Sequence, residues 1–186
     1  MQISEKKSKE QNITQNIIFA KRINMKKIGV LSDTHGYLPK EVYEFFKDVD
    51  LIIHAGDIGS EEVLDELQAF KKTIAVYGNI DDFGVITRTK KVENIEVEGL
   101  KIMITHIGGY PNKYEKGIKE LIELHRPNIF IAGHSHILKV MNDPKYSLLH
   151  INPGAAGRQG IHKISTLVRF KIDSEPKDLE ILEFNK

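Results

Sequence analysis

Three short apolar runs, separated by amphipathic segments, constrain the fold of this chain more than any other feature of its sequence. The runs are KKIGVLSD (26–33), DLIIHAGD (50–57) and TIAVYGN (73–79), and each is typical of a strand buried on both faces. The segments between them place apolar residues at helical spacing, with Pro39 in a first helical turn and Ser60 at a predicted N-cap. This β-α-β-α-β order predicts a parallel sheet with right-handed crossover connections.

The second half of the chain follows a different pattern. Two strand-like runs within residues 94–106 flank Glu98-Gly99, which predicts a hairpin. A helix is predicted over residues 114–125, and a buried strand over residues 128–134. Four further strand-like segments follow with no helix between them, so we expect the second half to be antiparallel. Two packed, mixed sheets flanked by helices, an α/β (α+β) architecture, accommodate both patterns.

Length and charge limit the number of domains and the kinds of partner. The 186 residues suit one domain, which we place at residues 25–186, and the polar, lysine-rich residues 1–24 are predicted to form a flexible extension. A net charge of +1 with mixed signs predicts no broad nucleic-acid surface. No apolar run approaches the roughly 20 residues of a membrane helix, so we expect no membrane contact and, by default, a cytoplasmic location. The oligomeric state is left open, with a small homo-oligomer as one option.

Five of the predicted strands end in a residue type that binds metal ions. Because ligands gather outside the carboxyl ends of strands in sheets of this kind, we expect these side chains to converge. The chain has no cysteine, and oxygen and imidazole donors suit a borderline divalent ion such as manganese, iron, zinc, cobalt or nickel. Seven ligands exceed the need of one zinc ion and suit two ions if one carboxylate bridges them. The seven candidates are Asp33, His35, Asp57, Asn79, His106, His134 and His136.

The combination of these residues carries more weight than any one of them. A single histidine at a strand end is usually structural, and Gly-Asp and Gly-Asn pairs are ordinary turn sequences. Four histidines at successive strand ends, interleaved with two aspartates and an asparagine, are hard to obtain by chance. The order of the motifs also argues against an amidohydrolase barrel, which would place H-x-H on the first strand, and against phosphoaspartate chemistry, which would place D-x-D there.

In this order and at this spacing, the motifs SDTHG, GDIG, GNID, ITH and GHSH resemble those of the calcineurin-like metallophosphoesterases. The later INPGAAG resembles a segment of the small YfcE-type phosphodiesterase subgroup, and the resemblance covers essentially residues 26–184. It implies a metallophosphatase-like, four-layer αββα sandwich with a dinuclear metal site. It also implies a ligand set in which the first ion is held by Asp33, His35 and His136, the second by Asn79, His106 and His134, and Asp57 bridges the two.

The resemblance implies a metal-dependent phosphoesterase, and most specifically a phosphodiesterase. A small phosphodiester would be hydrolysed by a hydroxide that bridges two divalent ions, among which we favour manganese over nickel, cobalt, zinc, iron or magnesium. The alternative from another class is a non-catalytic protein-interaction scaffold of the same fold, as in a retromer subunit. The full set of expected ligands favours the enzyme over the scaffold. A hydrolase of another bond type, using the same hydroxide, is a third hypothesis.

One departure from the family pattern leaves the leaving-group acid unassigned. Many larger members have a histidine at the position of Ile80, and an isoleucine cannot transfer a proton. Asp81 is a candidate for this acid, with a turn residue or a support for the ligands as its alternative role. Asn79 is expected both to ligate and to donate its NH2 group to the phosphate. Arg158, which follows the INPGAAG turn, is a candidate phosphate contact, although a solvated surface arginine is the alternative that we favour.

Several other polar and aromatic side chains are given structural roles at this stage. We expect Tyr110 and Tyr114 to pack in the core or on the surface, with the mouth of the metal cleft as an alternative. The INPGAAG segment is expected to border that cleft. Four histidines are assigned to packing, to the support of ligands or to the surface: His54, His125, His150 and His162.

Overall fold

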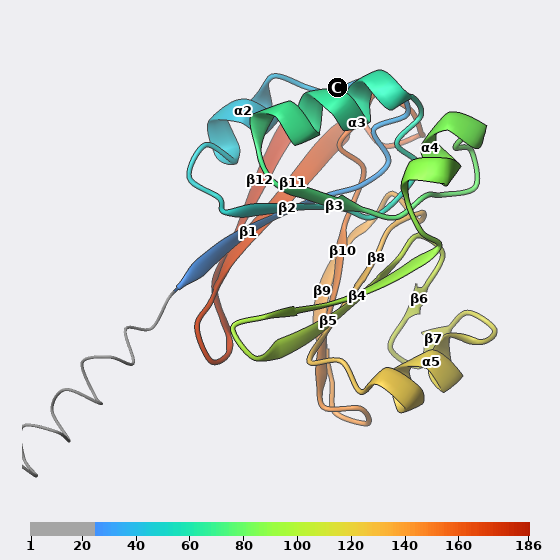
Figure 1. Cartoon of the computed structure of the whole chain (residues 1–186), viewed down its shortest axis with the longest axis vertical. Helices are drawn as coiled ribbons and strands as arrows, with labels where there is room; N and C mark the ends of the chain where they lie inside the picture. Colours follow the sequence, from blue (N-terminus) through green and yellow to red (C-terminus); the bar gives the residue numbers. More distant parts are fainter. Residues whose placement is uncertain (1–24) are drawn as a thin grey trace, which may run out of the picture.

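The computed structural model describes residues 25–186, so the predicted N-terminal extension lies outside the described residues. Two five-stranded sheets pack face to face, with helices on their outer sides, as Figure 1 shows. The expected α/β sandwich of two mixed sheets is therefore confirmed. None of the helices in the described part of the chain is long and apolar enough to cross a membrane.

The first sheet contains the three strands that the apolar runs predicted. Its order is β12-β11-β1-β2-β3, in which β1, β2 and β3 are parallel and β11 and β12 are added in antiparallel pairing. Because these parallel strands are buried on both faces, their sequences read as continuous apolar runs. The strands are β1 (Lys26–Leu31), β2 (Leu51–His54), β3 (Thr73–Ala75), β11 (Ile164–Ile172) and β12 (Pro176–Asn185).

The second sheet corrects the expectation that the second half of the chain is antiparallel. Its order is β4-β5-β8-β10-β9, and β8 is parallel both to β5 and to β10. The chain leaves β8 along the edge strand β9 and returns beside β8, which gives a parallel pair without an intervening helix. The strands are β4 (Val92–Val97), β5 (Leu100–Thr105), β8 (Ile129–Ala132), β9 (Leu138–Asp143) and β10 (Leu148–Pro153). The hairpin predicted at Glu98-Gly99 is confirmed between β4 and β5.

The helices cover the outer faces of the two sheets. Three of them lie over the first sheet and one lies beside the second (Figure 1): α2 (Glu41–Phe45), α3 (Glu61–Phe70), α4 (Phe83–Arg88) and α5 (Ile118–His125). The sequence did not predict α4, whose N-cap Asp82 accepts a hydrogen bond from the amide of Val85. Ser60 is at the N-cap of α3 as predicted, but its side chain makes no capping hydrogen bond.

The helix predicted over residues 114–125 begins later than expected. Tyr114 belongs to a short hairpin formed by β6 (Gly109–Tyr110) and β7 (Lys113–Tyr114). Gly117 precedes α5 with a φ of 85°, a left-handed conformation that stops the helix from extending toward the N-terminus. The small hairpin therefore replaces the first turn of the predicted helix.

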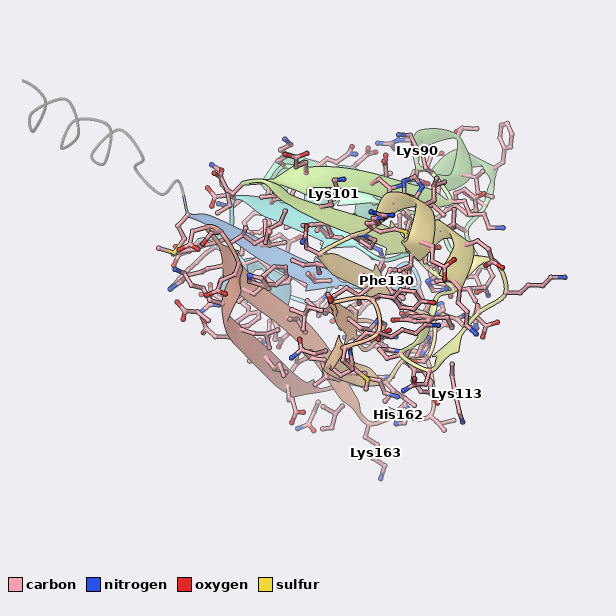
Figure 2. The ribbon with its side chains drawn as sticks, turned by 90° about the horizontal axis from the view of Figure 1, so that it is seen from below. Lys90, Lys101, Lys113, Phe130, His162 and Lys163 are labelled. Atoms are coloured by element: carbon pink, nitrogen blue, oxygen red, sulfur yellow. The ribbon has the colours of Figure 1, made fainter. Side chains whose placement is uncertain are left out.

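The apolar core lies between the two sheets and under the helices. Aliphatic side chains of β1, β2, β5, β8 and β10 form one buried cluster between the sheets. Phe130 is buried in a second cluster under α5 and lies near the middle of the view in Figure 2, whereas Lys163 lies at its lower margin. This packing fixes the two sheets against each other, so the carboxyl ends of strands from both sheets meet along one side of the sandwich.

Candidate metal centre

The candidate ligands lie on the loops that follow β1, β2, β3, β5 and β8, as the strand-end pattern predicted. The loops after β1 and β2 are joined by backbone hydrogen bonds from Asp33 to Gly56 (2.9 Å) and from His35 to Asp57 (3.0 Å). Positive φ values are uncommon for residues other than glycine and gather at functional sites. Five of the seven candidates have one: Asp33 (56°), His35 (49°), Asp57 (54°), His134 (69°) and His136 (57°).

The first ligand group consists of Asp33, His35 and His136. One donor atom from each of them lies within 4.8 Å of the others. His136 Nε2 is 3.1 Å from Asp33 Oδ1 and 3.3 Å from His35 Nε2. The Asp33 side chain is fully buried, whereas the two histidines are partly exposed. An ion at this position would be shielded on the Asp33 side and open on the histidine side.

The second ligand group consists of Asp57, His106 and His134, whose donor atoms also lie within 4.8 Å of one another. His106 Nε2 is 3.1 Å from Asp57 Oδ1, and the His106 and His134 rings meet edge to face with centroids 5.1 Å apart. Asp57 and His106 are buried, and His134 is exposed. This group therefore also has a closed side and an open side.

Asp57 joins the two groups through its carboxylate. Its Oδ1 faces His106 in the second group, and its Oδ2 is 3.8 Å from His35 Nε2 in the first. A single carboxylate with one oxygen toward each group has the arrangement expected of a bridging ligand.

The unpartnered polar atoms of these groups fit a bound cation. Among the residues that the structure describes, the buried atoms Asp33 Oδ1 and His106 Nε2 have no hydrogen-bond partner, an arrangement that is costly for polar atoms unless an ion or another ligand contacts them. His106 Nδ1 lies 2.8 Å from the Ala55 carbonyl oxygen, which can only accept a hydrogen bond. Nδ1 therefore carries the hydrogen, and the lone pair of Nε2 points into the site, as it does in metal-binding histidines.

The pKa values of the central pair follow from burial and mutual contact. Burial alone would lower the pKa of His106, but the close Asp57 carboxylate and the charge of Asp33 raise it above the usual value. For Asp57, burial would raise the pKa, and the close contact with His106 and its charge in the protonated form hold it below the usual value. Burial lowers the pKa of His35 despite the nearby aspartates. Asp57 is therefore an ionised carboxylate near neutral pH, the form that binds cations.

Glycines leave the space that the ligands occupy. A Cβ added at Gly78 would clash with Oδ1 of Asp57 and with its backbone. A Cβ at Gly56 would lie 2.5 Å from Cβ of His106, and the φ of Gly56 is +93°. The glycines that precede candidate ligands in the GD and GN motifs are therefore required by close approach and backbone conformation.

Asn79 and Asp81 lie on the loop after β3. Asn79 is exposed and lines a cavity of about 240 Å³ together with His106, which places it beside the second ligand group. The Asp81 carboxylate is buried and accepts hydrogen bonds from the amides of Gly59 (2.6 Å) and Gly78 (2.7 Å). Both of its oxygens thus hold together the loops that carry the ligands, which is the structural alternative proposed for this residue from the sequence.

The INPGAAG segment borders the first ligand group. Gly157, its last residue, donates a backbone hydrogen bond to the Asp33 carbonyl at 3.1 Å. In the loop that follows, a Cβ at Gly160 would lie 2.5 Å from Nδ1 of His136. Arg158 stacks on the Tyr37 ring at 3.8 Å and donates to the Tyr37 hydroxyl at 2.7 Å. Arg158 is therefore held on the loop beside the first group by an aromatic partner.

Two buried polar residues support the ligand loops from behind. His54 Nε2 lies 2.9 Å from Thr34 Oγ1, and burial lowers its pKa to about 4, so it supports the first loop as a neutral ring. Asn152 was given no role from the sequence, although the INPG motif contains it. Its Nδ2 donates to the Gly133 carbonyl (2.8 Å) and to Ser135 Oγ (3.0 Å), which fixes the loop that carries His134 and His136.

Several known proteins are similar to this chain in sequence or in fold. Residues 25–175 match the family model of the calcineurin-like phosphoesterase superfamily domain. A probable metallophosphoesterase of Methanothermobacter thermautotrophicus is 32% identical over 164 residues, which cover 83% of this chain and 91% of that protein. The solved structure of a novel archaeal phosphodiesterase has a TM-score of 0.67 at 26% identity, covering 86% of this chain and 99% of the other.

A further solved structure, Vacuolar Protein Sorting 29 of Cryptosporidium parvum, shares the fold with a TM-score of 0.61 at 18% identity, covering 87% of this chain and 99% of its own. The family match spans both ligand groups and every strand except β12. The chain belongs to the calcineurin-like phosphoesterase superfamily.

Proposed function

We propose that this protein is a dinuclear-metal-dependent phosphodiesterase. The observation that carries the proposal is the position of Asp57, with Oδ1 3.1 Å from His106 Nε2 and Oδ2 3.8 Å from His35 Nε2. One carboxylate between two ligand groups suits two ions a few ångströms apart, the arrangement found in many phosphoesterases. The phosphodiesterase named among the solved structures supports the same reaction class.

The ligand groups would hold two divalent ions, for which we favour manganese. When bound, such ions supply a hydroxide near neutral pH and neutralise charge on the phosphoryl oxygens. Asp57 and Asp33 provide the negative charge that retains the ions, and the neutral imidazoles leave the loaded site with the excess positive charge that attracts an anionic diester. The exposed Asn79 would use its carbonyl as a ligand and its NH2 group to orient a phosphoryl oxygen.

No proton donor is assigned to the leaving group. Asp81 uses both oxygens to accept backbone hydrogen bonds, so we propose a positioning role for it in place of the acid role. Ile80, which is 46% exposed near the second group, offers no proton. Esters with acidic leaving groups such as 4-nitrophenol should therefore be hydrolysed faster than alkyl esters.

The function is tested by reconstitution of the metal-free protein. Manganese, nickel, cobalt, zinc and magnesium are added separately, bound metal is counted, and release of 4-nitrophenolate from bis(4-nitrophenyl) phosphate is followed. We expect about two ions per chain and hydrolysis that depends on them. A protein that holds two ions and hydrolyses neither diesters nor monoesters would support the non-catalytic scaffold instead.

The role of Asn79 is tested separately. The Asn79→Ala variant should lose more turnover than the loss of the second ion explains, because the amide also contacts the phosphate. The measurement is turnover at metal concentrations that saturate both positions. Unchanged turnover with two ions bound would show that Asn79 contributes nothing beyond metal binding.

A further inference from the structure

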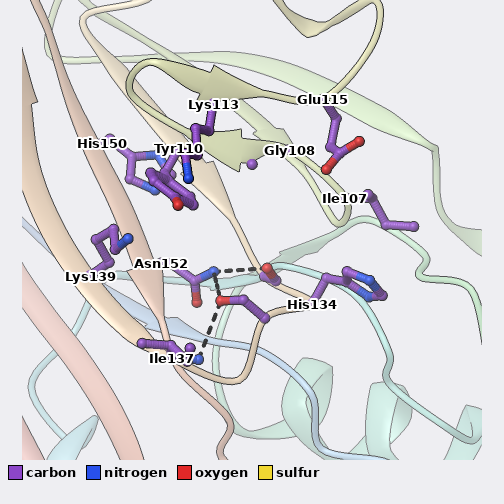
Figure 3. A pocket seen from close by; sticks show the side chains of 13 residues that line it. Ile107, Gly108, Tyr110, Lys113, Glu115, His134, Ile137, Lys139, His150 and Asn152 are labelled. Atoms are coloured by element: carbon purple, nitrogen blue, oxygen red, sulfur yellow. Dashed lines mark hydrogen bonds between the residues drawn. The ribbon is translucent and has the colours of Figure 1, made fainter.

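A cavity of about 340 Å³ lies beside the metal centre, on the outer face of the second sheet. We call it the side cavity, and Figure 3 shows it between the β6–β7 hairpin and strands β9 and β10. His134, a ligand of the second group, lines one end, and Tyr110 and His150 line the other. Its volume falls within the range of small-molecule sites, about 300–1,000 Å³. Tyr110, which was expected to pack in the core or on the surface, lines this side cavity.

His150 is the least expected residue in the lining of the side cavity. Its side chain is fully buried, and neither Nδ1 nor Nε2 has a hydrogen-bond partner within residues 25–186. Leaving a buried donor or acceptor unpaired is costly, so a histidine here is unfavourable for the fold alone. Leu148, two residues earlier on the same face of β10, is an ordinary core residue. The contrast indicates that His150 has a partner that is not part of the fold.

Lys139 brings a positive charge to the same space. It lies opposite Asn152 in the β9–β10 pairing, and its ammonium is 3.4 Å from the centroid of the Tyr110 ring. In the described residues this ammonium takes part in no ion pair, and the cation–π contact orients it without neutralising it. Burial first, and the charge of Lys139 second, lowers the pKa of His150 to about 4. His150 is therefore a neutral ring near pH 7, with one N–H donor close to a cation.

The charged side chains of the side cavity lie on two sides, with lysines on one side and a glutamate on the other. Lys113 lines the cavity next to Tyr110, on the side of His150 and Lys139. Glu115 lines the opposite side in Figure 3, near Ile107. Asn152 Nδ2 already donates to Gly133 and Ser135, so it has no free donor for a molecule bound in the cavity. The end lined by Tyr110 and His150 thus presents the Lys139 ammonium and an imidazole N–H, with the exposed Lys113 beside them, and these donors match an anion.

We propose that the side cavity binds the organic arm of the substrate, and that this arm carries a second anionic group, a phosphate or a carboxylate, received by the Lys139 ammonium and the His150 N–H. The inference rests on the proposed phosphodiesterase function, since it places the scissile phosphate at the metal centre and the rest of the molecule in the cavity. It narrows the substrate class from any small phosphodiester to diesters with an additional negative charge.

The kinetic test compares three phosphodiesters that release 4-nitrophenolate and differ only in the second arm. The arms are ethyl, 2-carboxyethyl and 2-phosphooxyethyl. We expect kcat/KM of the metal-loaded protein to be at least about ten-fold higher for one or both charged arms than for ethyl, the size of one charge-assisted hydrogen bond. A preference for only one charged arm identifies the anion as phosphate or carboxylate. Equal values for all three arms would overturn the proposal.

Lys139→Ala separates a specific contact from general attraction to the metal centre. In this variant the ratio of kcat/KM between charged and ethyl arms should fall to about one, because the charge that discriminates is gone. The matched control is Lys145→Ala, which removes a lysine stacked on Tyr146 at 4.7 Å, outside the side cavity. The control should keep the wild-type ratio. A ratio that survives Lys139→Ala would assign the preference to the metal centre and contradict the proposal.

A binding measurement decides the inference even if no diester is hydrolysed. The imidazole resonances of His150 in the metal-free protein are followed by NMR during titration with 2-hydroxyethyl phosphate, 3-hydroxypropanoate or ethanol. At least one anion should cause a saturable shift, ethanol should cause none, and Lys139→Ala should weaken the anion at least about ten-fold. If neither anion shifts His150, the proposal is wrong whatever the enzyme hydrolyses. If an anion shifts the His150 resonances but no ester is cleaved, the proposed function is wrong and the proposed anion site is supported.

Discussion

The two ligand groups of the metal centre use similar side chains but are held by the protein in different ways. In the second group, His106 Nδ1 donates to the Ala55 carbonyl, and Asp57 Oδ1 accepts a hydrogen bond from the amide of Ile80 at 3.2 Å. In the first group, the His35 and His136 rings contact each other through Nε2 at 3.3 Å, and each faces one aspartate. The backbone therefore orients His106 and Asp57 in the second group. In the first group it holds Asp33, whose Oδ2 accepts a hydrogen bond from the amide of His134 at 3.2 Å, whereas side-chain contacts orient the two histidines.

This difference indicates which position is ready to bind. A histidine whose second nitrogen is hydrogen-bonded already has the right tautomer and ring orientation, so less ordering remains for the ion to impose. Two imidazole nitrogens at 3.3 Å without an ion between them gain little from each other. We therefore expect the second group to bind its ion more tightly, and Asp57 to couple the two positions.

The largest effect is expected from Asp57→Asn, because this substitution affects both ligand groups at once. An amide has one oxygen and no charge, so it cannot serve both ions. Turnover should fall by at least about a thousand-fold and bound metal should fall below two ions per chain. The control is Asp50→Asn, an exposed aspartate just before β2, which should leave both unchanged. If the Asp57→Asn variant keeps its full metal content and turnover, the proposed bridging role of Asp57 is wrong.

The next effect compares one glycine in each group. Gly78→Ala places a methyl group against Asp57 Oδ1 and the Asp57 backbone, which cannot move away, so turnover should fall about 100-fold. At Gly160, an added Cβ meets the ring of His136 at 2.5 Å, and the φ of +97° adds backbone strain to an alanine. Because this glycine lies on an exposed loop that can shift, we expect a loss of only about three-fold. Rates of metal-saturated variants, with thermal unfolding as a check of folding, provide the measurement. Equal losses would contradict the view that the second group is the more rigid.

Removal of the metal ions compares the affinities of the two ligand groups without altering the ligands. During titration with a chelator, the two ions should leave in separate steps that differ about 10- to 100-fold in affinity, the usual effect of hydrogen bonds that orient ligands. His136→Ala should abolish the weaker step and keep the tighter one, because it belongs to the first group. Metal content measured by mass spectrometry distinguishes the steps. A single step for both ions, or loss of the tighter step in His136→Ala, would reverse the assignment.

The smallest effect is expected for Asp81→Asn, which distinguishes positioning from acid catalysis. One carboxylate oxygen is replaced by an NH2 group that faces a backbone N–H, so the unfolding free energy should fall by about 1–3 kcal/mol. Turnover should fall about ten-fold, equally for nitrophenyl and alkyl esters, because the ligand loops loosen. The measurements are urea unfolding and rates for the two kinds of ester. A selective loss on alkyl esters would return Asp81 to the role of the acid.

Local sequence patterns were sufficient for most of the fold. The parallel strands of the first sheet, the Glu98-Gly99 hairpin and the polar strand ends follow from apolar periodicity and turn chemistry, which act between near neighbours. Errors arose where a distant partner decides the outcome. The pairing of β10 with β8 is one example, because nothing in the residues between them specifies its direction.

The residue types at the strand ends can be read from the amino-acid sequence, and they define the kind of chemistry that they serve. Their division into two groups follows from the packing of the fold. His35 and His136 are 101 residues apart in the chain and 3.3 Å apart in space, and this contact exists because the two sheets pack face to face. The same holds for Asp81 and His150, whose roles depend on amides, cations and cavities supplied by other elements. Side-chain identity is local, whereas burial and partners are properties of the assembled fold.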